Sequence, residues 1–169
     1  MSKVISALLA AVLLLPFAAS AQTPVQPSPD HEAMLSSGDA RVIANKRLVY
    51  DLWREVWEAG HAELAEKYMA ESYVQHNPNV PNGRAAFIGF LNRMKKVVPI
   101  EPRVKSPLVT ITGDRDLVML AFVRELPDPR EPGKTYTTTW FDMFRVENGK
   151  IVEHWDGALK SPPQPQPQQ

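Results

Sequence analysis

The chain contains no cysteine, which excludes a disulfide framework, thiolate catalysis and cysteine-ligated metal sites. Lysine and arginine together number 19, as do aspartate and glutamate, so the basic excess typical of nucleic-acid-binding proteins is also missing. The sequence has no Gly-rich phosphate loop, no Walker lysine and no nucleophile elbow. We therefore expect neither nucleotide chemistry nor a nucleic-acid partner.

Long apolar runs are scarce. The run over residues 4–15 is too short to hold a protein stably in a bilayer. Lys3 precedes it, and Ala19-Ser20-Ala21 follows as a small-x-small cleavage site, which is the pattern of a secretory signal peptide. A buried N-terminal helix fits this pattern less well. We expect a signal peptide over residues 1–21, cleavage after Ala21, and a periplasmic or secreted protein with no stable membrane anchor.

The 169 residues suffice for one domain with a single core. Residues 22–38 are rich in Pro, Gln and Ser and are expected to form a flexible lead-in outside the core. Residues 161–169 are expected to form a disordered Pro/Gln tail, either a solvated terminus or a docking peptide. The folded domain is therefore expected over residues 39–160.

Apolar residues recur at helical spacing in three segments, which predicts helices over residues 39–59, 61–69 and 84–98. Asp39 is the expected N-cap of the first helix, and Gly60 is its expected end. After the second helix, the segment from Tyr73 to Pro78 is predicted to be a loop, because Asn-Pro favours extended or turn geometry.

The second half of the chain has the composition of β-strands. Strands are predicted over residues 103–112, 117–126, 136–146 and 150–156. Helices that precede consecutive strands indicate an α+β domain, with three N-terminal helices packed on a strongly curved antiparallel sheet. Such a sheet would enclose a cavity suited to a small molecule.

The last two strands flank the Asn-Gly pair at 148–149, which predicts a hairpin with a type I′ turn. A regular register would place Asp142 and Trp155 on one face and His154 and Asp156 on the other. Both sets can line one pocket only if a β-bulge shifts the register near the open end of the hairpin.

Two segments carry a family resemblance: YVQHNPNVPNG at residues 73–83 and FDMFRVENGKIVEHWD at residues 141–156. Together with the order of elements, they resemble the SnoaL-like polyketide cyclase branch of the nuclear transport factor 2-like superfamily, in particular its predicted aldol-condensation-catalysing proteins. The likeness covers about residues 42–160 and implies a cone-shaped nuclear transport factor 2-like fold. Members include cyclases, isomerases, dehydratases, epoxide hydrolases and proteins without catalysis, so the fold does not fix the function.

The resemblance also implies site residues. It places Asp142 where related enzymes carry a pocket carboxylate and Asp156 where cyclases carry an acid/base aspartate, with His154 and His76 as partners or orienting groups. Such enzymes need no cofactor, because a desolvated carboxylate takes a proton from a carbon beside a carbonyl. The expected substrate-binding residues are aromatic: Tyr73, Trp57, Trp140, Phe144, Trp155 and Phe122.

Two functions follow as hypotheses. The first is a cofactor-independent lyase or isomerase acting on a small apolar carbonyl compound. The second is a non-catalytic periplasmic binding protein for a lipophilic small molecule. Superfamily relatives also commonly form homodimers across the outer face of the sheet, which Phe141 and its neighbouring threonines would suit.

Simpler roles stay open for each site residue. Asp142 could pair with Arg145, His154 and Asp156 could be an exposed pair at a strand end, and His76 could cap the Asn-Pro turn. His31 and His61 are expected in solvent. A metal site made of His76, His154 and Asp156 lacks diagnostic spacing, so no metal is expected.

Overall fold

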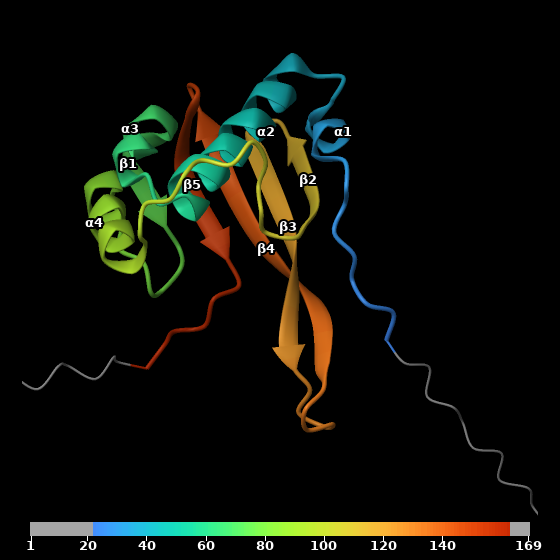
Figure 1. The fold of residues 1–169 in the computed structure, drawn as a ribbon. Helices are drawn as coiled ribbons and strands as arrows, with labels where there is room; N and C mark the ends of the chain where they lie inside the picture. The colour runs from blue at the N-terminus through green and yellow to red at the C-terminus, as the bar shows by residue number, and fades with distance from the viewer. Residues whose placement is uncertain (1–21, 163–169) are drawn as a thin grey trace, which may run out of the picture.

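The computed structural model describes residues 22–162, in which helices lie against one face of a strongly twisted sheet (Figure 1). The expected signal peptide and residues 163–169 of the expected tail fall outside the described residues. Across residues 22–162, no helix has both the length and the apolar character needed to cross a membrane.

The main helix follows its sequence pattern. α2 (Ala40–Leu52) begins after Asp39, whose carboxylate accepts hydrogen bonds from two backbone N–H groups of the first turn, at 2.8 and 3.4 Å. The predicted N-cap is thus confirmed. The helix runs directly into a π-helical segment, η1 (Trp53–Glu58). Gly60 ends it with φ of 76°, and a Cβ there would lie 2.7 Å from a backbone oxygen, so only glycine fits.

The other two predicted helices are shorter than expected. The second consists of a 3₁₀ turn, η2 (Ala62–Leu64), and a single α-turn, α3 (Ala65–Tyr68). The third, α4 (Arg84–Met94), ends four residues before the predicted end at Val98, whose side chain is exposed. Beyond it, residues 95–107 cross the end of η1 without regular structure.

An additional short helix, α1 (His31–Leu35), occupies part of the expected flexible lead-in. His31 is buried and its Nδ1 lies 2.8 Å from the hydroxyl of Tyr50. Leu35 belongs to the hydrophobic core. The predictions that residues 22–38 lie outside the core and that His31 lies in solvent are therefore wrong, because one helical turn is too short to give a periodic signal.

The sheet has five strands in the order β1-β5-β4-β3-β2, and all neighbours are antiparallel except β1 and β5. The strands are β1 (Met69–Gln75), β2 (Leu108–Asp114), β3 (Leu117–Pro127), β4 (Thr135–Glu147) and β5 (Lys150–Asp156). The fold class is as predicted. The predicted loop from Tyr73 is wrong, because residues up to Gln75 belong to β1, whose pairing with β5 is non-local and is not encoded in the neighbouring sequence.

The predicted hairpin of β4 and β5 is confirmed. Asn148 and Gly149 have φ of 51° and 70°, as a type I′ turn requires. The register is not regular, since Val146 pairs with Ile151 whereas the preceding Arg145 pairs with residue 153. The required β-bulge exists, but it lies beside the turn and not near the open end.

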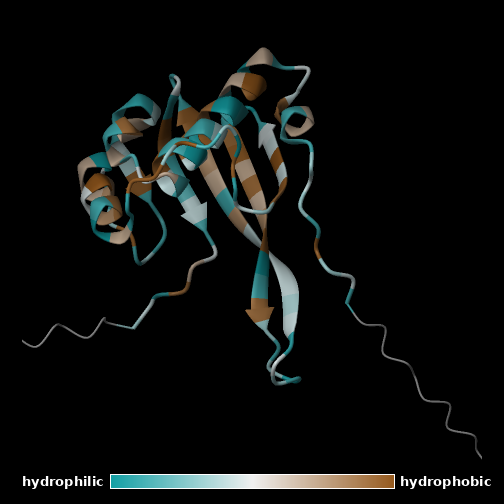
Figure 2. Ribbon diagram, viewed as in Figure 1, coloured by the Kyte–Doolittle hydropathy of each residue, from teal (hydrophilic) through white to brown (hydrophobic). Residues whose placement is uncertain are grey.

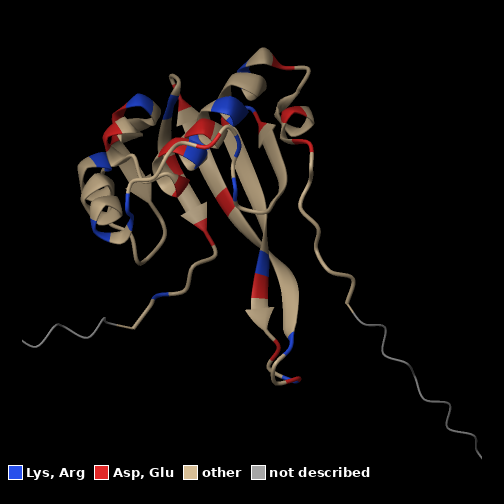
Figure 3. Cartoon of the chain, viewed as in Figure 1, with Lys and Arg blue, Asp and Glu red and all other residues tan. Residues whose placement is uncertain are grey.

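The helices and the inner face of the sheet enclose the core. Figure 2 shows hydrophobic residues along the strands where α2 crosses them. The core residues with the least exposure come from both layers: Val49, Val56, Tyr68, Met69, Leu91, Leu108, Val118, Leu120 and Ile151. Figure 3 shows charged residues on the outer surfaces of the helices and on the end of the β3–β4 pair, which projects beyond the helices (Figure 1).

Candidate active site

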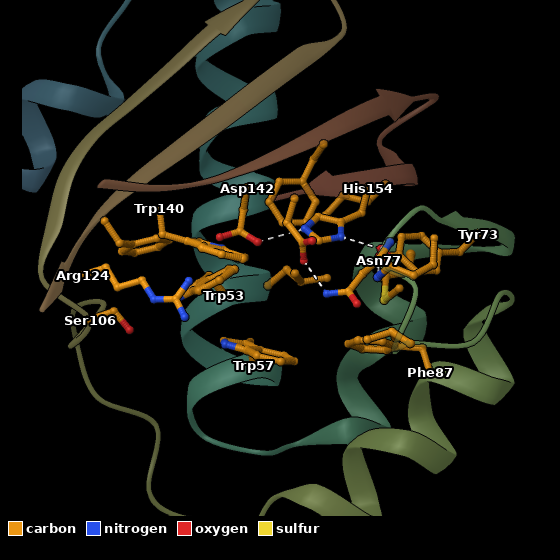
Figure 4. A pocket seen from close by; sticks show the side chains of 18 of the residues that line it. Trp53, Trp57, Tyr73, Asn77, Phe87, Ser106, Arg124, Trp140, Asp142 and His154 are labelled. Carbon is orange, nitrogen blue, oxygen red and sulfur yellow. Dashed lines mark hydrogen bonds and ion pairs between the residues drawn. The ribbon is translucent and has the colours of Figure 1, made fainter. Parts of the chain in front are cut away.

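A cavity of about 460 Å³ lies between the helices and the inner face of the sheet. Large aromatic side chains form much of its wall (Figure 4). The aromatic lining residues are Trp53, Trp57, Tyr73, Phe87, Phe122, Trp140 and Phe144. Polar side chains also line it: Gln75, Asn77, Ser106, Arg124, Asp142, His154 and Asp156. A few polar groups in an apolar pocket are typical of a small-molecule site.

The β-bulge brings the ionisable groups together. Because Val152 has no partner in β4, the following residues of β5 are shifted by one position, so that Phe144 pairs with His154 and Asp142 pairs with Asp156. Directly paired residues project from the same face of a sheet. All four side chains therefore line the cavity.

Asp142 and His154 form a buried hydrogen-bonded pair. Oδ1 of Asp142 lies 3.0 Å from Nε2 of His154, and the two residues are 4% and 7% exposed. The ring of His154 also contacts that of Phe144, with centroids 4.6 Å apart. The pair is thus held in an apolar environment, where an unpaired charge would be costly.

β1 supplies the group that orients His154. Nδ1 of His154 lies 2.8 Å from Oε1 of Gln75, which also accepts a hydrogen bond of 2.9 Å from the backbone N–H of Asn77. A backbone N–H can only donate, so the shared atom of Gln75 is its oxygen. Nδ1 of His154 must then carry a hydrogen. The other end of Gln75 donates to the hydroxyl of Tyr73 at 3.0 Å.

This arrangement fixes the proton content of the pair. With a hydrogen on Nδ1, Nε2 of His154 either accepts a proton from a neutral Asp142 carboxyl or donates one to its carboxylate. Both forms hold one proton between Oδ1 and Nε2 and have no net charge. Burial raises the pKa of Asp142, an effect opposed by its hydrogen bond to His154, by the imidazolium charge and, most weakly, by the nearby indole N–H of Trp140.

The two aspartates of the cavity differ in their free oxygen atoms. Both oxygens of Asp156 accept hydrogen bonds, from Nδ2 of Asn77 at 2.6 Å and from the backbone N–H of Ala158 at 2.9 Å. Oδ2 of Asp142 is buried and has no hydrogen-bond partner among residues 22–162. The same holds for Nε1 of Trp53. Asp142 therefore keeps a free acceptor atom and Trp53 a free donor, both belonging to residues of the cavity wall.

The same ionisable groups also have the donor types of a metal site. Ligand atoms of Asp142, His154 and Asp156 all lie within 4.8 Å of one another. Nε2 of His154 and Oδ1 of Asp142 already bond to each other, so a cation there would have to displace the proton that they share. The set considered from the sequence, His76, His154 and Asp156, differs in one residue, because His76 bonds to Glu153 outside the cavity and Asp142 takes its place.

His76 and Trp155 do not line the cavity, which corrects both predictions. Gln75 and Asn77 point inward, so strand alternation turns His76 outward. There its Nε2 bonds to Oε1 of Glu153 at 2.7 Å, and its ring stacks on that of Trp155 with centroids 5.1 Å apart. The bulge likewise puts Trp155 on the outer face, opposite Met143.

Two simpler interpretations are also excluded. Arg145 does not pair with Asp142, because its guanidinium bonds to Asp116 at 2.5 Å and to Glu153 at 3.1 Å. His154 is buried, so it is no exposed strand-end residue. The predicted residues that do line the cavity are Asp142, His154, Asp156, Tyr73, Trp57, Trp140, Phe144 and Phe122; their roles stay predictions.

Sequence reasoning missed two polar residues, Gln75 and Asn77, and one basic residue, Arg124. Gln75 and Asn77 follow the predicted Tyr73 with a period of two in the segment YVQHNPNVPNG. Reading that segment as a strand would have found them. Arg124 lies at the end of an apolar strand pattern and carries no motif. Trp53 both packs in the core and lines the cavity.

Comparison with known proteins identifies the family. The family model of the SnoaL-like domain matches residues 50–154, more than half of the chain. No curated protein matches the chain.

Similar solved structures include three from different bacteria. A candidate SnoaL-like polyketide cyclase from Jannaschia sp. CCS1 has 16% identity and a TM-score of 0.50, covering 72% of this chain and 91% of that one. A candidate polyketide cyclase from Acidithiobacillus ferrooxidans has 20% identity and a TM-score of 0.48, covering 72% and 89%. An LEH-like epoxide hydrolase from M. tuberculosis has 17% identity and a TM-score of 0.47, covering 67% and 80%. At these identities the likeness is one of fold.

Because the family model spans β1, α4 and the strands that build the cavity, the chain belongs to the SnoaL-like domain family, within the nuclear transport factor 2-like superfamily.

Proposed function

We propose that this protein is a cofactor-independent lyase or isomerase that transfers a proton next to the carbonyl group of a small apolar compound. Asp142 is the acid/base group, and His154 is its partner. The observation that carries the proposal is the free Oδ2 of a buried carboxyl group on an aromatic cavity, with its Oδ1 bonded to His154.

The chemistry follows from the two forms of the pair. In the ion-pair form, Oδ2 of Asp142 accepts a proton from the carbon beside the carbonyl, and the electron pair of that C–H bond moves to the carbonyl oxygen. Return of the proton to another carbon completes an isomerisation, whereas departure of a leaving group from the β-carbon completes a lyase reaction. The imidazolium of His154 stabilises the carboxylate before transfer and the enolate afterwards.

The surrounding residues hold this chemistry in place. Gln75 keeps the hydrogen on Nδ1 of His154, so the ring presents Nε2 to Asp142. Burial raises the pKa of Tyr73, which keeps its hydroxyl neutral and able to donate a hydrogen bond. Nε1 of Trp53 is a buried donor that has no partner among the described residues, and a shift of its ring toward the cavity would let it donate to a substrate oxygen.

A second function is favoured by the aromatic walls, since Trp53 stacks on Phe122 with ring centroids 4.6 Å apart. Such walls suit a lipophilic ligand that is bound without reaction. Replacing Asp142 with Asn decides between the two functions, with Asp128→Asn in the β3–β4 turn as the matched control. If the protein is an enzyme, Asp142→Asn lowers turnover and changes ligand affinity by less than about tenfold, or about 1.4 kcal/mol. The binding-protein function is supported if the ligand binds to the wild type and to both variants and none of the three proteins converts it.

We also propose that the protein is exported and acts in the periplasm or outside the cell, on the strength of the signal pattern over residues 1–21. N-terminal sequencing of protein recovered from a periplasmic or culture fraction should begin at Gln22. Recovery of the protein with Lys3 still present would contradict this proposal.

Finally, we propose a homodimer formed through the outer face of the sheet, where the side chain of Phe141 is 49% exposed. An exposed aromatic residue on a bare sheet face is commonly covered by a partner. Sedimentation should give a dimer for the wild type and a monomer for Phe141→Lys. A wild-type monomer at micromolar concentration would contradict the proposal.

A further inference from the structure

The wall of the cavity contains one strongly basic group without an ionic partner. Among the described residues that line it, Arg124 is the only lysine or arginine. No hydrogen bond or salt bridge joins its guanidinium to any residue from 22 to 162. The neighbouring Glu125 accepts instead from the hydroxyl of Thr135 at 2.6 Å.

Arg124 is held by stacking. Its Cζ lies 4.6 Å from the ring centroid of Trp140, on the next strand. Stacking fixes the plane of a guanidinium and leaves its N–H edge free for a planar anion. Arg124 is thus oriented on the cavity wall with its donors unused, a geometry suited to a carboxylate or sulfonate.

Arg124 lies at one side of the cavity. In Figure 4 it is drawn beside Trp140 and Ser106, whereas Tyr73 and Phe87 lie on the opposite side of the lining. A ligand anion is attracted to Arg124, so the basic group orients a molecule with one anionic end.

We propose that Arg124 determines specificity by binding an anionic group at one end of a ligand whose apolar body fills the aromatic cavity. The ligand class is therefore an apolar organic acid. This inference rests on the proposed function in that it uses the same cavity, and it names the part of the substrate that the proton-transfer chemistry leaves undefined.

The test compares two fluorescent probes that differ in one group. 8-Anilinonaphthalene-1-sulfonate is anionic, and N-phenyl-1-naphthylamine is the same molecule without the sulfonate. We expect the wild type to bind the anionic probe at least about tenfold more tightly, a difference of about 1.4 kcal/mol. The preference should shrink with added salt, because Arg124 is exposed to solvent and dissolved ions screen its charge.

Variants assign the preference to one residue. Arg124→Gln should reduce the preference for the anionic probe to less than about threefold, which is a difference under about 0.7 kcal/mol. The affinity for the neutral probe should stay the same. Arg124→Lys should retain part of it, since the charge stays but the stacked planar group is lost. The control, Arg130→Gln in the exposed β3–β4 turn, removes the same charge and should keep the full preference. Near-UV circular dichroism checks that each variant is folded.

Several results would overturn the inference. These are equal binding of the two probes by the wild type, binding of neither probe, a preference that survives Arg124→Gln, or an equal loss for both probes in that variant. The readout is binding of the two probes and needs no turnover. Failure of the proposed proton-transfer function would therefore leave this result intact, and the reverse holds as well.

Discussion

Nε2 of His154 lies 3.0 Å from Oδ1 of Asp142 although a regular hairpin register would place the two side chains on opposite faces of the sheet. The unpaired residue Val152 makes the difference, because one extra residue reverses the orientation of everything that follows it in the strand. The candidate active site thus depends on a single-residue irregularity next to the hairpin turn.

Deleting Val152 tests whether the bulge acts only by setting which residues of β5 pair with β4. The deletion removes the bulge and leaves Ile151 opposite Val146 and His154 opposite Phe144, now in regular pairing. We expect the contact between His154 and Asp142, and any ligand binding, to survive. NMR of the His154 ring nitrogens and probe titration would measure this. Loss of the pair in the deletion variant would show that the twist of the bulge, and not the register alone, positions His154.

Replacing Gln75 with Leu should destabilise the protein. The change leaves two donors without an acceptor: the buried Nδ1–H of His154 and the partly buried backbone N–H of Asn77. Each unsatisfied buried group costs about 1–3 kcal/mol. Chemical denaturation should show this loss, and Gln75→Glu, which keeps an acceptor, should restore part of it. Equal stability of Gln75→Leu and the wild type would mean that Gln75 does not orient the ring.

The stability of the protein should depend on pH through Asp142. Burial raises the pKa of this carboxyl group, so the native state binds more protons than the unfolded state above the ordinary carboxyl pKa of about 4. The stabilisation from its protonation is fully present below about pH 4 and is lost as the pH rises through the native pKa.

The variant Asp142→Asn isolates this effect, because Asn does not ionise. The free energy of unfolding of the wild type minus that of the variant should fall as the pH rises above about 4. Denaturant titrations of both proteins across this range would measure it. A difference that is constant or that increases with pH would contradict the raised pKa.

Gly60 provides a test of the helix that carries Trp53 and Trp57. Its φ of 76° and the 2.7 Å approach of a backbone oxygen to any Cβ predict that Gly60→Ala is destabilising by more than about 1 kcal/mol. Gly38→Ala, where nothing lies within 4 Å of the added atom, is the control. Thermal unfolding of both variants would compare them, and equal melting temperatures would contradict the expectation.

These residues also show where sequence patterns suffice. The cap at Asp39 and the turn at 148–149 depend on neighbouring residues only, and both were predicted correctly. The α+β class followed from the order of periodic segments. By contrast, β1 pairs with β5 across most of the domain, and the only local sign of the strand is the period-two alternation of residues 73, 75 and 77, which the Asn-Pro turn signal outweighed.

The site was predictable only where its residues carry a local signal. Asp142, His154 and Asp156 were identified through a motif, and the need for a bulge followed from strand alternation. The position of the bulge depends on which apolar residues must face the core, which is a property of the packed sheet. The inward side chains of Gln75 and Asn77, and the outward one of His76, depended on the missed strand.

The central claim is that Asp142, through its free Oδ2, carries the proton. The most direct measurement is turnover by Asp142→Asn and Asp156→Asn on one substrate, found by screening carbonyl compounds for exchange of the α-proton with deuterium from solvent. The account predicts that Asp142→Asn lowers kcat by about 10²–10⁴-fold with ligand affinity changed less than about tenfold, while Asp156→Asn has a smaller effect. Exchange at the wild-type rate in Asp142→Asn would contradict it.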